Sequence, residues 1–421
     1  MRICHITAEY PPRVGGVGDY VRRLSREFAA RGHEVTVVTT EGLGGEPARP
    51  GAASPRVLSV VKSWNLRGLP RLWKVLNELE ADAYVLEYVA YMYGRGGVAP
   101  WLLAFFLAFK LRRNKTLVLN AHELWRPAYR SRRDKALTLL SFLVFLGGAW
   151  AGTRVVVTND FRRNLLTGVL GMDPARVRKI PVGANVEPPG RSASPRRGDG
   201  EFRVMTFGSW HEDRSVEDLV DAVMALRATR PVRLSVIGSF GDNDEQRARV
   251  RALRDRAGPD GWLDLEEDVP PARVSDYFAR ADAYVSPLAG GPSGRRGSVM
   301  AALAHGVPLV AYDGYERDGV FRDGYNVVLL RGGNGAGIRA ALGALMTDEG
   351  RGRALAAAGR ATFEEYFAWD VIADRWEELF AELAPARGGA RRQSAERLPF
   401  LGRAAGEVAP AELACSPTEE F

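Results

Sequence analysis

The stretch that decides the fold spans residues 2–40 and divides into four segments, RICHITA (2–8), YPPRVGG (10–16), VGDYVRRLSREFAAR (17–31) and EVTVVTT (34–40). The first and last segments are apolar enough to form short buried strands. Between them, Val21, Leu24 and Phe28 share one stripe of a helix, and Gly32 stands where a glycine often ends one. A strand, a glycine-rich loop, a helix and a second strand predict the opening of a doubly wound α/β domain.

The alternation of strands and helices continues, stops and starts again. Further strands are expected at residues 84–87, 116–120, 154–158 and 177–181, and, after a segment rich in Pro, Gly, Ser and Arg, at 202–207, 233–237, 284–286 and 308–311. These two series predict an α/β fold of two doubly wound Rossmann-like domains that face a cleft. The expected boundaries are an N-terminal domain at 1–185, a linker at 186–201 and a C-terminal domain at 202–365.

The end of the chain divides into two parts. An amphipathic helical stretch covers residues 362–384, and we expect a helix at 366–385 to return to the N-terminal domain. Beyond it the chain is rich in Arg, Gly, Ala and Ser, which predicts a disordered tail at 386–421.

Charge is distributed unevenly along the chain. Residues 1–200 carry 31 basic and 16 acidic residues, a net charge of +15, whereas residues 201–421 carry 27 and 35, a net charge of −8. This asymmetry agrees with two domains and predicts an anionic partner for the first of them. A nucleic-acid partner is not expected, because no binding motif is present and the second half is acidic.

Two apolar runs lie in the basic half. Residues 98–109 precede a Lys- and Arg-rich segment at 110–115, and residues 136–151 follow Arg126, Arg130, Arg132, Arg133 and Lys135. Both runs are shorter than a membrane span requires. They are interpreted either as buried helices of the first domain or as a surface whose apolar groups enter a membrane interface while Arg and Lys meet anionic lipid.

Two segments of the N-terminal half carry candidate ligand-binding residues. Gly15 and Gly16 lie between the first strand and the first helix, where small residues let a phosphate approach the helix N-terminus. A plain tight turn is the alternative. His122 follows the strand at 116–120, at the end of the sheet where α/β proteins bind ligands, and a hydrogen-bonded structural histidine is the alternative.

The C-terminal half carries candidate cations. Arg214 precedes a helix expected at 215–227, so it either meets a diphosphate or is an exposed arginine without a role. A denser cluster precedes the helix expected at 298–305, and its position favours an anion site over a structural loop. Its candidate residues are Ser293, Gly294, Arg295, Arg296, Gly297 and Ser298. The five His residues are scattered, so no metal site and no cofactor are expected.

Six segments in the same order resemble the retaining glycosyltransferases of family 4, which have the GT-B fold. They are Pro11-Pro12 with Gly15-Gly16 and Arg31-Gly32-His33-Glu34-Val35; Asn120-Ala-His122-Glu123-Leu124-Trp125; Ile180-Pro-Val-Gly-Ala-Asn185; Ala302-Leu-Ala-His-Gly306-Val-Pro308-Leu-Val310; Arg322-Asp-Gly-Tyr-Asn326; and Phe367-Ala-Trp369-Asp370. The resemblance covers residues 1–384.

The resemblance implies roles for the candidates already singled out. It implies that the backbone at Gly16 approaches the donor phosphates and that His122, the catalytic candidate, lies near the reacting sugar. It places Arg214 where the family has a phosphate-binding Lys. The donor binds mainly to the C-terminal domain and the acceptor to the N-terminal one, where Arg13, Asp19 and Tyr20 are acceptor-side candidates.

The chain departs from the family at three positions. Ser209 stands where the family has an Arg, and Ser293 and Ala301 stand where its Glu-x7-Glu pair belongs. Since those glutamates contact the sugar and the ribose, their absence puts the donor in doubt. Arg295 and Arg296 add positive charge in the same loop, which we interpret as stronger binding of the diphosphate.

The sequence therefore predicts a retaining, nucleotide-sugar-dependent hexosyltransferase of cell-envelope glycan synthesis. Its donor is a nucleotide sugar, and its acceptor is a glycan, a lipid-linked sugar or a phospholipid. The alternatives are a catalytically impaired GT-B binding protein and a GT-B phosphorylase or epimerase. The first residues lead directly into a fold, so we expect a cytoplasmic protein, either free or at the inner face of an anionic membrane.

Overall fold

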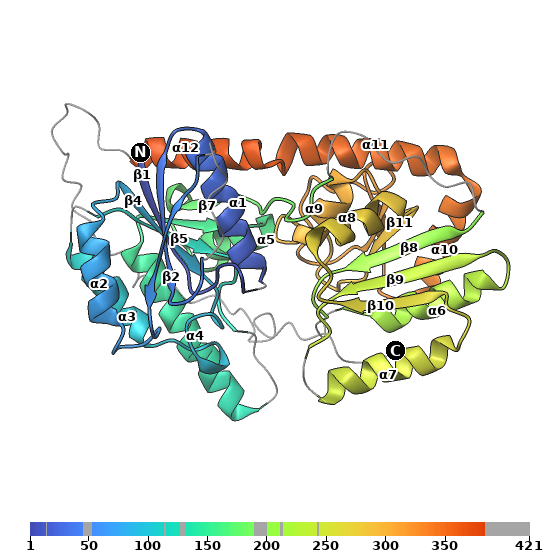
Figure 1. Cartoon of the computed structure of the whole chain (residues 1–421), viewed down its shortest axis with the longest axis horizontal. Helices are drawn as coiled ribbons and strands as arrows, with labels where there is room; N and C mark the ends of the chain where they lie inside the picture. Colours follow the sequence, from blue (N-terminus) through green and yellow to red (C-terminus); the bar gives the residue numbers. More distant parts are fainter. Residues whose placement is uncertain are drawn as a thin grey trace.

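A computed structural model describes residues 1–13, 15–44, 53–112, 115–126, 131–188, 200–210, 214–241 and 244–383. Most of the linker expected at 186–201 and all of the tail expected at 386–421 lie outside the described residues. Two parallel sheets follow one another along the chain, and helices cover both faces of each (Figure 1). The prediction of two doubly wound α/β domains is confirmed.

The first sheet has the order β3-β2-β1-β4-β5-β6-β7, and all its neighbours are parallel. Its strands are β1 (Arg2–Ile6), β2 (Glu34–Thr40), β3 (Arg56–Val61), β4 (Ala83–Tyr88), β5 (Leu117–Ala121), β6 (Arg154–Val157) and β7 (Val177–Lys179). Helices α2 (Leu69–Glu78), α3 (Trp101–Leu111) and α4 (Arg132–Ala151) fill the core on one face, and α1 (Gly16–Ala30) lies on the other. Short helical segments complete the domain: η1 (Arg95–Gly97), α5 (Asp160–Asn164), η2 (Leu165–Val169) and η3 (Pro174–Arg176).

The second sheet repeats this topology in the order β10-β9-β8-β11-β12-β13. Its strands are β8 (Phe202–Phe207), β9 (Val232–Gly238), β10 (Leu263–Glu267), β11 (Ala283–Ser286), β12 (Leu309–Tyr312) and β13 (Val328–Leu330). One face packs on α6 (Val216–Arg227), α7 (Asp244–Ala257) and α10 (Gly335–Thr347), and the other on α8 (Pro271–Arg280), α9 (Gly297–Ala304) and α11 (Glu349–Tyr366).

The end of the described chain connects the two domains. The single helical stretch expected at 362–384 is two helices, α11 and α12 (Trp369–Leu383), which run along one edge of the molecule (Figure 1). They separate at residues 367–368 because Phe367 stacks on Phe321 of the C-terminal domain, whereas Trp369 belongs to the core of the N-terminal domain. Helix α12 packs on α1, where Trp376 Nε1 donates a hydrogen bond to Tyr20 at 3.0 Å.

The two apolar runs form α3 and α4. Helix α4 begins earlier than the run at 136–151, because Ser131 caps it by accepting a hydrogen bond from Asp134 N at 3.0 Å. Among the described residues, α4 alone is both long and apolar enough to cross a membrane, a test that buried helices of soluble proteins also pass. Its buried side, which includes Val144 and Phe145, belongs to the core of the N-terminal domain.

Candidate active site between the two domains

Both sheets reverse their strand order between the first strand and the fourth, at β1/β4 and at β8/β11. In parallel α/β sheets ligands bind at such a point, outside the carboxyl ends of the strands. The loops that follow β1 and β11 both touch the segment that follows β7. Asn185 Nδ2 donates to the Gly16 carbonyl at 3.3 Å, and Val182 N donates to the Gly294 carbonyl at 2.7 Å.

Gly16 opens α1 and faces free space. A Cβ placed on Gly16 meets no described atom within 4 Å, so the backbone is accessible to a ligand from this side. The helix N-terminus beside it already carries a carboxylate, since Glu9 Oε1 accepts a hydrogen bond from Gly18 N at 2.9 Å. A Cβ on Gly15 would collide with the same Glu9 side chain. Any phosphate that approaches Gly16 therefore meets Glu9 as well, which the sequence did not indicate.

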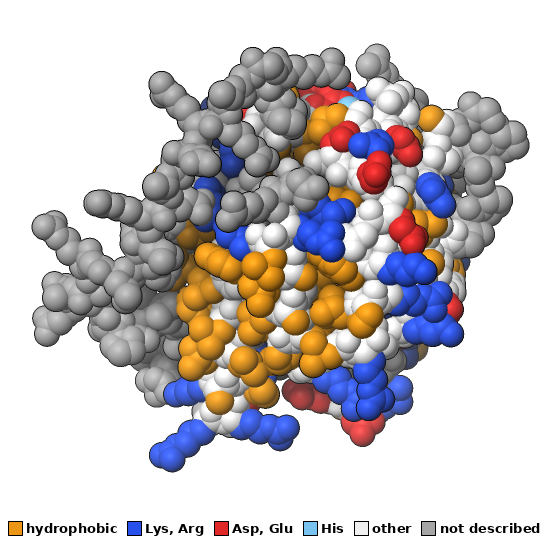
Figure 2. Space-filling model, turned by 90° about the vertical axis from the view of Figure 1, so that its left-hand side faces the viewer, with side chains coloured by type: hydrophobic (Ala, Val, Ile, Leu, Met, Phe, Trp, Pro, Cys, Tyr) orange, Lys and Arg blue, Asp and Glu red, His pale blue; other side chains and the backbone are white. Residues whose placement is uncertain are grey.

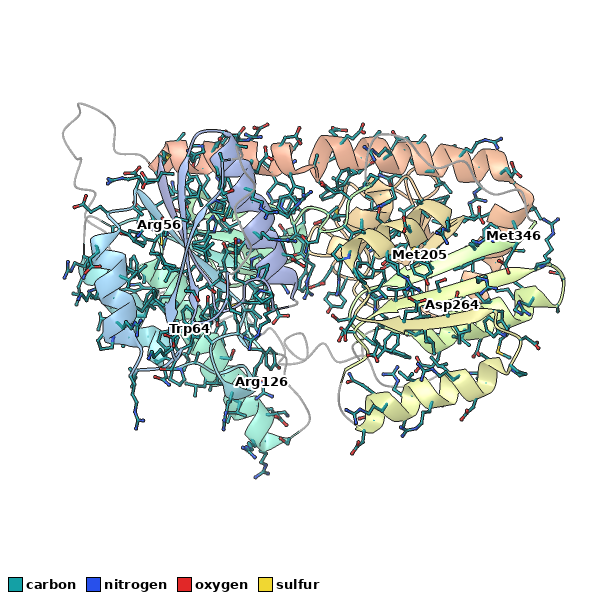
Figure 3. The ribbon with its side chains drawn as sticks, in the orientation of Figure 1. Arg56, Trp64, Arg126, Met205, Asp264 and Met346 are labelled. Atoms are coloured by element: carbon teal, nitrogen blue, oxygen red, sulfur yellow. The ribbon has the colours of Figure 1, made fainter. Side chains whose placement is uncertain are left out.

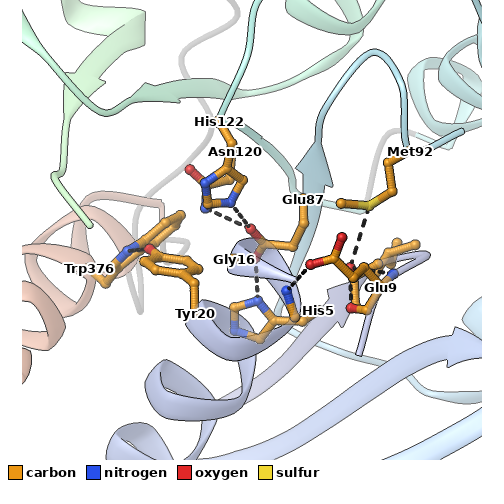
Figure 4. A network of polar contacts seen from close by, with 12 residues as sticks. His5, Glu9, Gly16, Tyr20, Glu87, Met92, Asn120, His122 and Trp376 are labelled. Carbon is orange, nitrogen blue, oxygen red and sulfur yellow. Dashed lines mark hydrogen bonds and ion pairs between the residues drawn. The ribbon is translucent and has the colours of Figure 1, made fainter. Parts of the chain in front are cut away.

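His122 is held by a buried carboxylate at the end of β4. Glu87 is completely buried, and its oxygens lie 2.7 Å from His122 Nε2 and 2.7 Å from His5 Nδ1 (Figure 4). Asn120 Nδ2 donates to Glu87 at 2.8 Å. Burial raises the pKa of the Glu87 carboxyl, but the hydrogen bonds and charges of His122 and His5 outweigh it and lower the pKa to about 2. His122 is therefore oriented by an ionised glutamate.

The acceptor-side candidates lie at different depths. Arg13 is exposed in the loop before α1, and Asp19 forms an ion pair with Arg22 at 3.2 Å on the first turn of α1. Tyr20 is buried, and its ring lies edge-on to the His122 ring with their centroids 4.9 Å apart. Tyr20 therefore supports His122 from within the core and does not line an open surface.

Arg214, Ser298 and Gly208 meet at the end of β8. Arg214 is buried, so the interpretation of an exposed arginine is wrong, and its Nη1 donates to Thr206 Oγ1 at 3.0 Å. A Cβ on Gly208 would lie 2.9 Å from Arg214 Nη2 and 3.7 Å from Ser298 Oγ, and Gly208 has a φ of 125° that favours glycine. Arg214 Nε has no hydrogen-bond partner among the described residues. The guanidinium and the first turn of α9 form a corner whose positive charge suits an anion.

The loop before α9 is less cationic than its sequence indicates. Glu316 is buried in the loop after β12. Its Oε2 lies 2.9 Å from Arg295 Nη1 and 3.4 Å from Arg296 Nη2. Burial raises the pKa of Glu316, but Arg295, Arg162 and Arg296 lower it further, so the carboxylate is ionised. The sequence predicted that both arginines add positive charge for a diphosphate. That prediction is corrected here, because Glu316 offsets part of the charge of Arg295 and Arg296.

Gly294 lies at the contact between the domains, and Ser293 beside it is buried. Gly294 N donates to Asp318 at 2.6 Å, and a Cβ on Gly294 would lie 2.8 Å from Pro181 Cβ. Ser293 is completely buried, and its Oγ has no hydrogen-bond partner among the described residues. The other half of the loop differs, because Gly297 lies at the start of α9 and a Cβ there meets only the Gly183 carbonyl, at 3.7 Å. Gly297 and Ser298 are thus the open part of this cluster.

Ion pairs tie the loops of the two domains together beside His122. Arg295 Nη2 lies 3.9 Å from Glu123 Oε1, and Arg162 Nε lies 3.9 Å from Glu316 Oε1. Arg162 also donates to the His122 carbonyl. The sequence did not single out Glu87, Glu316 or Arg162; the signal for Glu87 was a carboxylate inside an otherwise apolar strand.

Two parallel-sheet domains with this topology, joined by a helix that returns to the first, define the GT-B class of glycosyltransferases. The model of Glycosyltransferase Family 4 matches residues 14–188, and that of Glycosyl transferases group 1 matches residues 201–348. Family models of glycosyltransferases thus match both domains of the chain, in agreement with the resemblance to glycosyltransferase family 4 found in the sequence.

Known proteins similar to this chain include two mycobacterial enzymes and one solved structure. A glycogen synthase of Mycobacterium tuberculosis is 25% identical over 96% of this chain and 99% of its own length. A phosphatidyl-myo-inositol mannosyltransferase of Mycobacterium leprae is 26% identical over 91% of this chain and 96% of its own. The structure of Anabaena HepE, in complex with UDP and glucose, superposes with a TM-score of 0.67 and 15% identity over 90% of this chain and 99% of HepE.

Proposed function

We propose that the chain is a retaining hexosyltransferase that moves a sugar from a nucleotide-sugar donor to a hydroxyl of a lipid-linked or phospholipid acceptor of the cell envelope. The observation that carries this proposal is the corner formed by Arg214, Ser298 and Gly208, which lies at the strand-order reversal of the C-terminal domain. Two similar proteins support it: HepE was solved with UDP and glucose, and the mannosyltransferase is named for a phospholipid acceptor.

In the proposed reaction the bond between the anomeric carbon and the donor phosphate breaks, and a bond from that carbon to the acceptor oxygen forms. Negative charge grows on the leaving diphosphate, where the Arg214 guanidinium and the N–H groups at the start of α9 stabilise it. The departing phosphate takes the proton of the acceptor hydroxyl, so no protein base is required. His122, oriented by Glu87, donates or accepts a hydrogen bond at the sugar.

A catalytically impaired binding protein is the second candidate. The observation that favours it is that Ser293 and Ala301 carry no carboxylate, and both are buried. Glu316, which follows β12, brings a carboxylate to the loop before α9. Its Oε2 would lie 3.2 Å from a Cβ placed on Gly290. We propose that Glu316 takes over part of the role of the missing pair.

One experiment separates these candidates. The full chain is first screened for thermal stabilisation by UDP-, GDP- and ADP-sugars, since a ligand of the folded state raises the unfolding temperature with dose. The stabilising donor is then incubated, radiolabelled, with detergent-dispersed phospholipid or polyprenyl-phosphate-linked acceptors. Transfer with the donor's anomeric configuration kept supports the proposal. Binding without transfer or hydrolysis supports the impaired protein, and phosphate-dependent release or donor conversion without acceptor supports a phosphorylase or an epimerase.

A further inference from the structure

Helices α3 and α4 expose an apolar surface on the side of the N-terminal domain away from α1. Six large apolar side chains point outward from them and are between 40% and 73% exposed; they are Leu103, Leu107, Leu111, Leu139, Leu143 and Trp150. Figure 2 views this side of the molecule and shows hydrophobic side chains gathered together, with Lys and Arg along their border. We call these six residues the apolar face.

The apolar face is continuous across both helices. A Cβ on Gly147 of α4 would lie 2.5 Å from Leu103 Cδ2 of α3, so this glycine lets the two helices approach closely. One turn further along α4, Lys110 Nζ of α3 lies 5.2 Å from the centre of the Trp150 ring. The exposed leucines therefore form a surface shared by two packed helices, not scattered single side chains.

Positive charge lies at both ends of the apolar face. Arg132, Arg133 and Lys135 are exposed on the first turn of α4, and Lys110 and Arg112 lie at the end of α3. Asp134 is the single acidic residue of the two helices, and its carboxylate is 3.0 Å from Arg126 Nη2. An apolar centre with basic ends is complementary to the acyl and anionic headgroup layers of a phospholipid bilayer.

Helix α4 is fixed to the domain along its other side. Val144, Phe145 and Ala149 are buried in the core of the N-terminal domain, and a Cβ on Gly148 would lie 2.7 Å from Phe106 Cζ. A helix that crossed the bilayer would expose this core. The packing therefore keeps α4 beside α3 on the surface of the domain.

We propose that the apolar face docks on an anionic phospholipid bilayer, with α3 and α4 lying in the plane of its interface. The docking does not depend on the proposed function, but it would give that function a route to lipid acceptors. The loop that follows His122 packs on α4, where the Trp125 and Phe142 rings are 5.0 Å apart, and Arg126 N donates to Ser141 Oγ at 3.2 Å. Figure 3 shows Arg126 beside α4, on the side of the second domain.

The test is sedimentation of the full chain with vesicles of phosphatidylcholine alone or mixed with phosphatidylglycerol. We expect binding to the mixed vesicles, weaker binding at high salt, and release by alkaline carbonate. Leu107→Ser with Leu143→Ser, and separately Arg132→Glu with Arg133→Glu, should each weaken binding by roughly tenfold or more. The controls are Met224→Ser on α6 and Arg251→Glu with Arg254→Glu on α7, which change exposed residues of the other domain.

Equal binding to both kinds of vesicle, or variants that bind as well as their controls, would overturn the proposal. Resistance to carbonate would overturn it in favour of a spanning helix. The salt and lipid dependence of the unchanged protein needs no variant, so a variant that fails to fold leaves the test intact. Transfer to a detergent-dispersed acceptor is measured separately, so that loss of docking and absence of transferase activity are distinguished.

Discussion

Glu87 Oε2 lies 2.7 Å from His122 Nε2, and the same carboxylate binds His5 through its other oxygen. Three donors, from His5, Asn120 and His122, converge on one buried carboxylate. A glutamine in its place offers a single acceptor oxygen, so at least one of these hydrogen bonds must be lost or reversed. The orientation of His122 thus depends on an ionised side chain that is itself completely buried.

Glu87→Gln should lower kcat about tenfold, the value of one hydrogen bond, while the donor KM changes little. The shift of the His122 ring nitrogens in an NMR spectrum should change, which a merely structural role of Glu87 would not require. An unchanged kcat with a native spectrum would contradict the positioning role. Asn77→Asp, a partly buried position outside the site, is a control for the amide–carboxylate exchange.

The same variant predicts a pH dependence of stability. The folded-state pKa of Glu87 is about 2, below the usual value of about 4.3 for an unfolded chain. Its stabilising contribution is therefore complete above about pH 4.3 and is lost as the pH falls toward 2. We expect the difference in unfolding free energy between the wild type and Glu87→Gln, from urea titrations, to shrink over this interval. A difference that stays constant from pH 7 to pH 3 would contradict the assignment.

Gly16→Ala should leave the fold intact and weaken donor binding by tenfold or more. Its added methyl group meets no described atom within 4 Å, but it occupies the space through which a ligand approaches the backbone. Thermal unfolding checks the first expectation and donor titration the second. Gly343→Ala on α10 is the control, since its methyl group lies 3.7 Å from Leu226 in an ordinary contact. An unchanged donor affinity in Gly16→Ala would contradict a donor site next to the N-terminus of α1.

Arg214→Ala should weaken donor binding more than Arg295→Ala does. The Arg214 guanidinium is buried and held in place by Thr206. Its loss should remove a charge-assisted hydrogen bond to the donor diphosphate, which is worth about 2 kcal/mol, or roughly 30-fold in Kd. Arg295 is bonded to both oxygens of Glu316, so we expect only a few-fold effect from its loss. Isothermal titration with the nucleoside diphosphate measures both. The reverse order would place the diphosphate at the Glu316 loop.

Gly294→Ala should loosen the contact between the domains. The added methyl group would clash with the Thr158 carbonyl and lie 2.8 Å from Pro181 Cβ, and such overpacking costs about 1–3 kcal/mol. We expect a larger radius of gyration in solution scattering and a lower unfolding temperature. Gly319→Ala, whose methyl group meets no described atom, is the control. An unchanged radius would show that residues 181 and 294 can separate without a change in shape.

The sequence predicted those parts of the fold and site that depend on local pattern. The two strand–loop–helix openings, His122 after β5 and Arg214 before α6 all follow from residues close in sequence. The partners of these groups come from distant segments: Glu87 is 82 residues from His5, and Glu316 is 21 residues from Arg295. The expected charge of the arginine loop was therefore too high, because the carboxylate that offsets it lies outside the motif.

Some elements were missed because their pattern is weak. Strand β10 (Leu263–Glu267) lies at the edge of its sheet and carries three acidic residues, and α7 buries only Val250 and Leu253. The break between α11 and α12 was missed because the sequence is amphipathic before and after it, so the two helices look like one. The helices divide because Phe367 is buried in the C-terminal domain and Trp369 in the N-terminal domain. No local sequence pattern indicates which domain buries each residue.

The chain passes between the domains at two places, and these places touch: Trp369 Nε1 donates to the Ala184 carbonyl at 2.9 Å. With a single crossing, one domain could rotate about any axis relative to the other. Two crossings fastened side by side remove the twist and leave rotation about the line that passes through them. Any relative rotation of the two domains is therefore confined to one axis, so the Arg214 corner can move relative to His122 along a single arc.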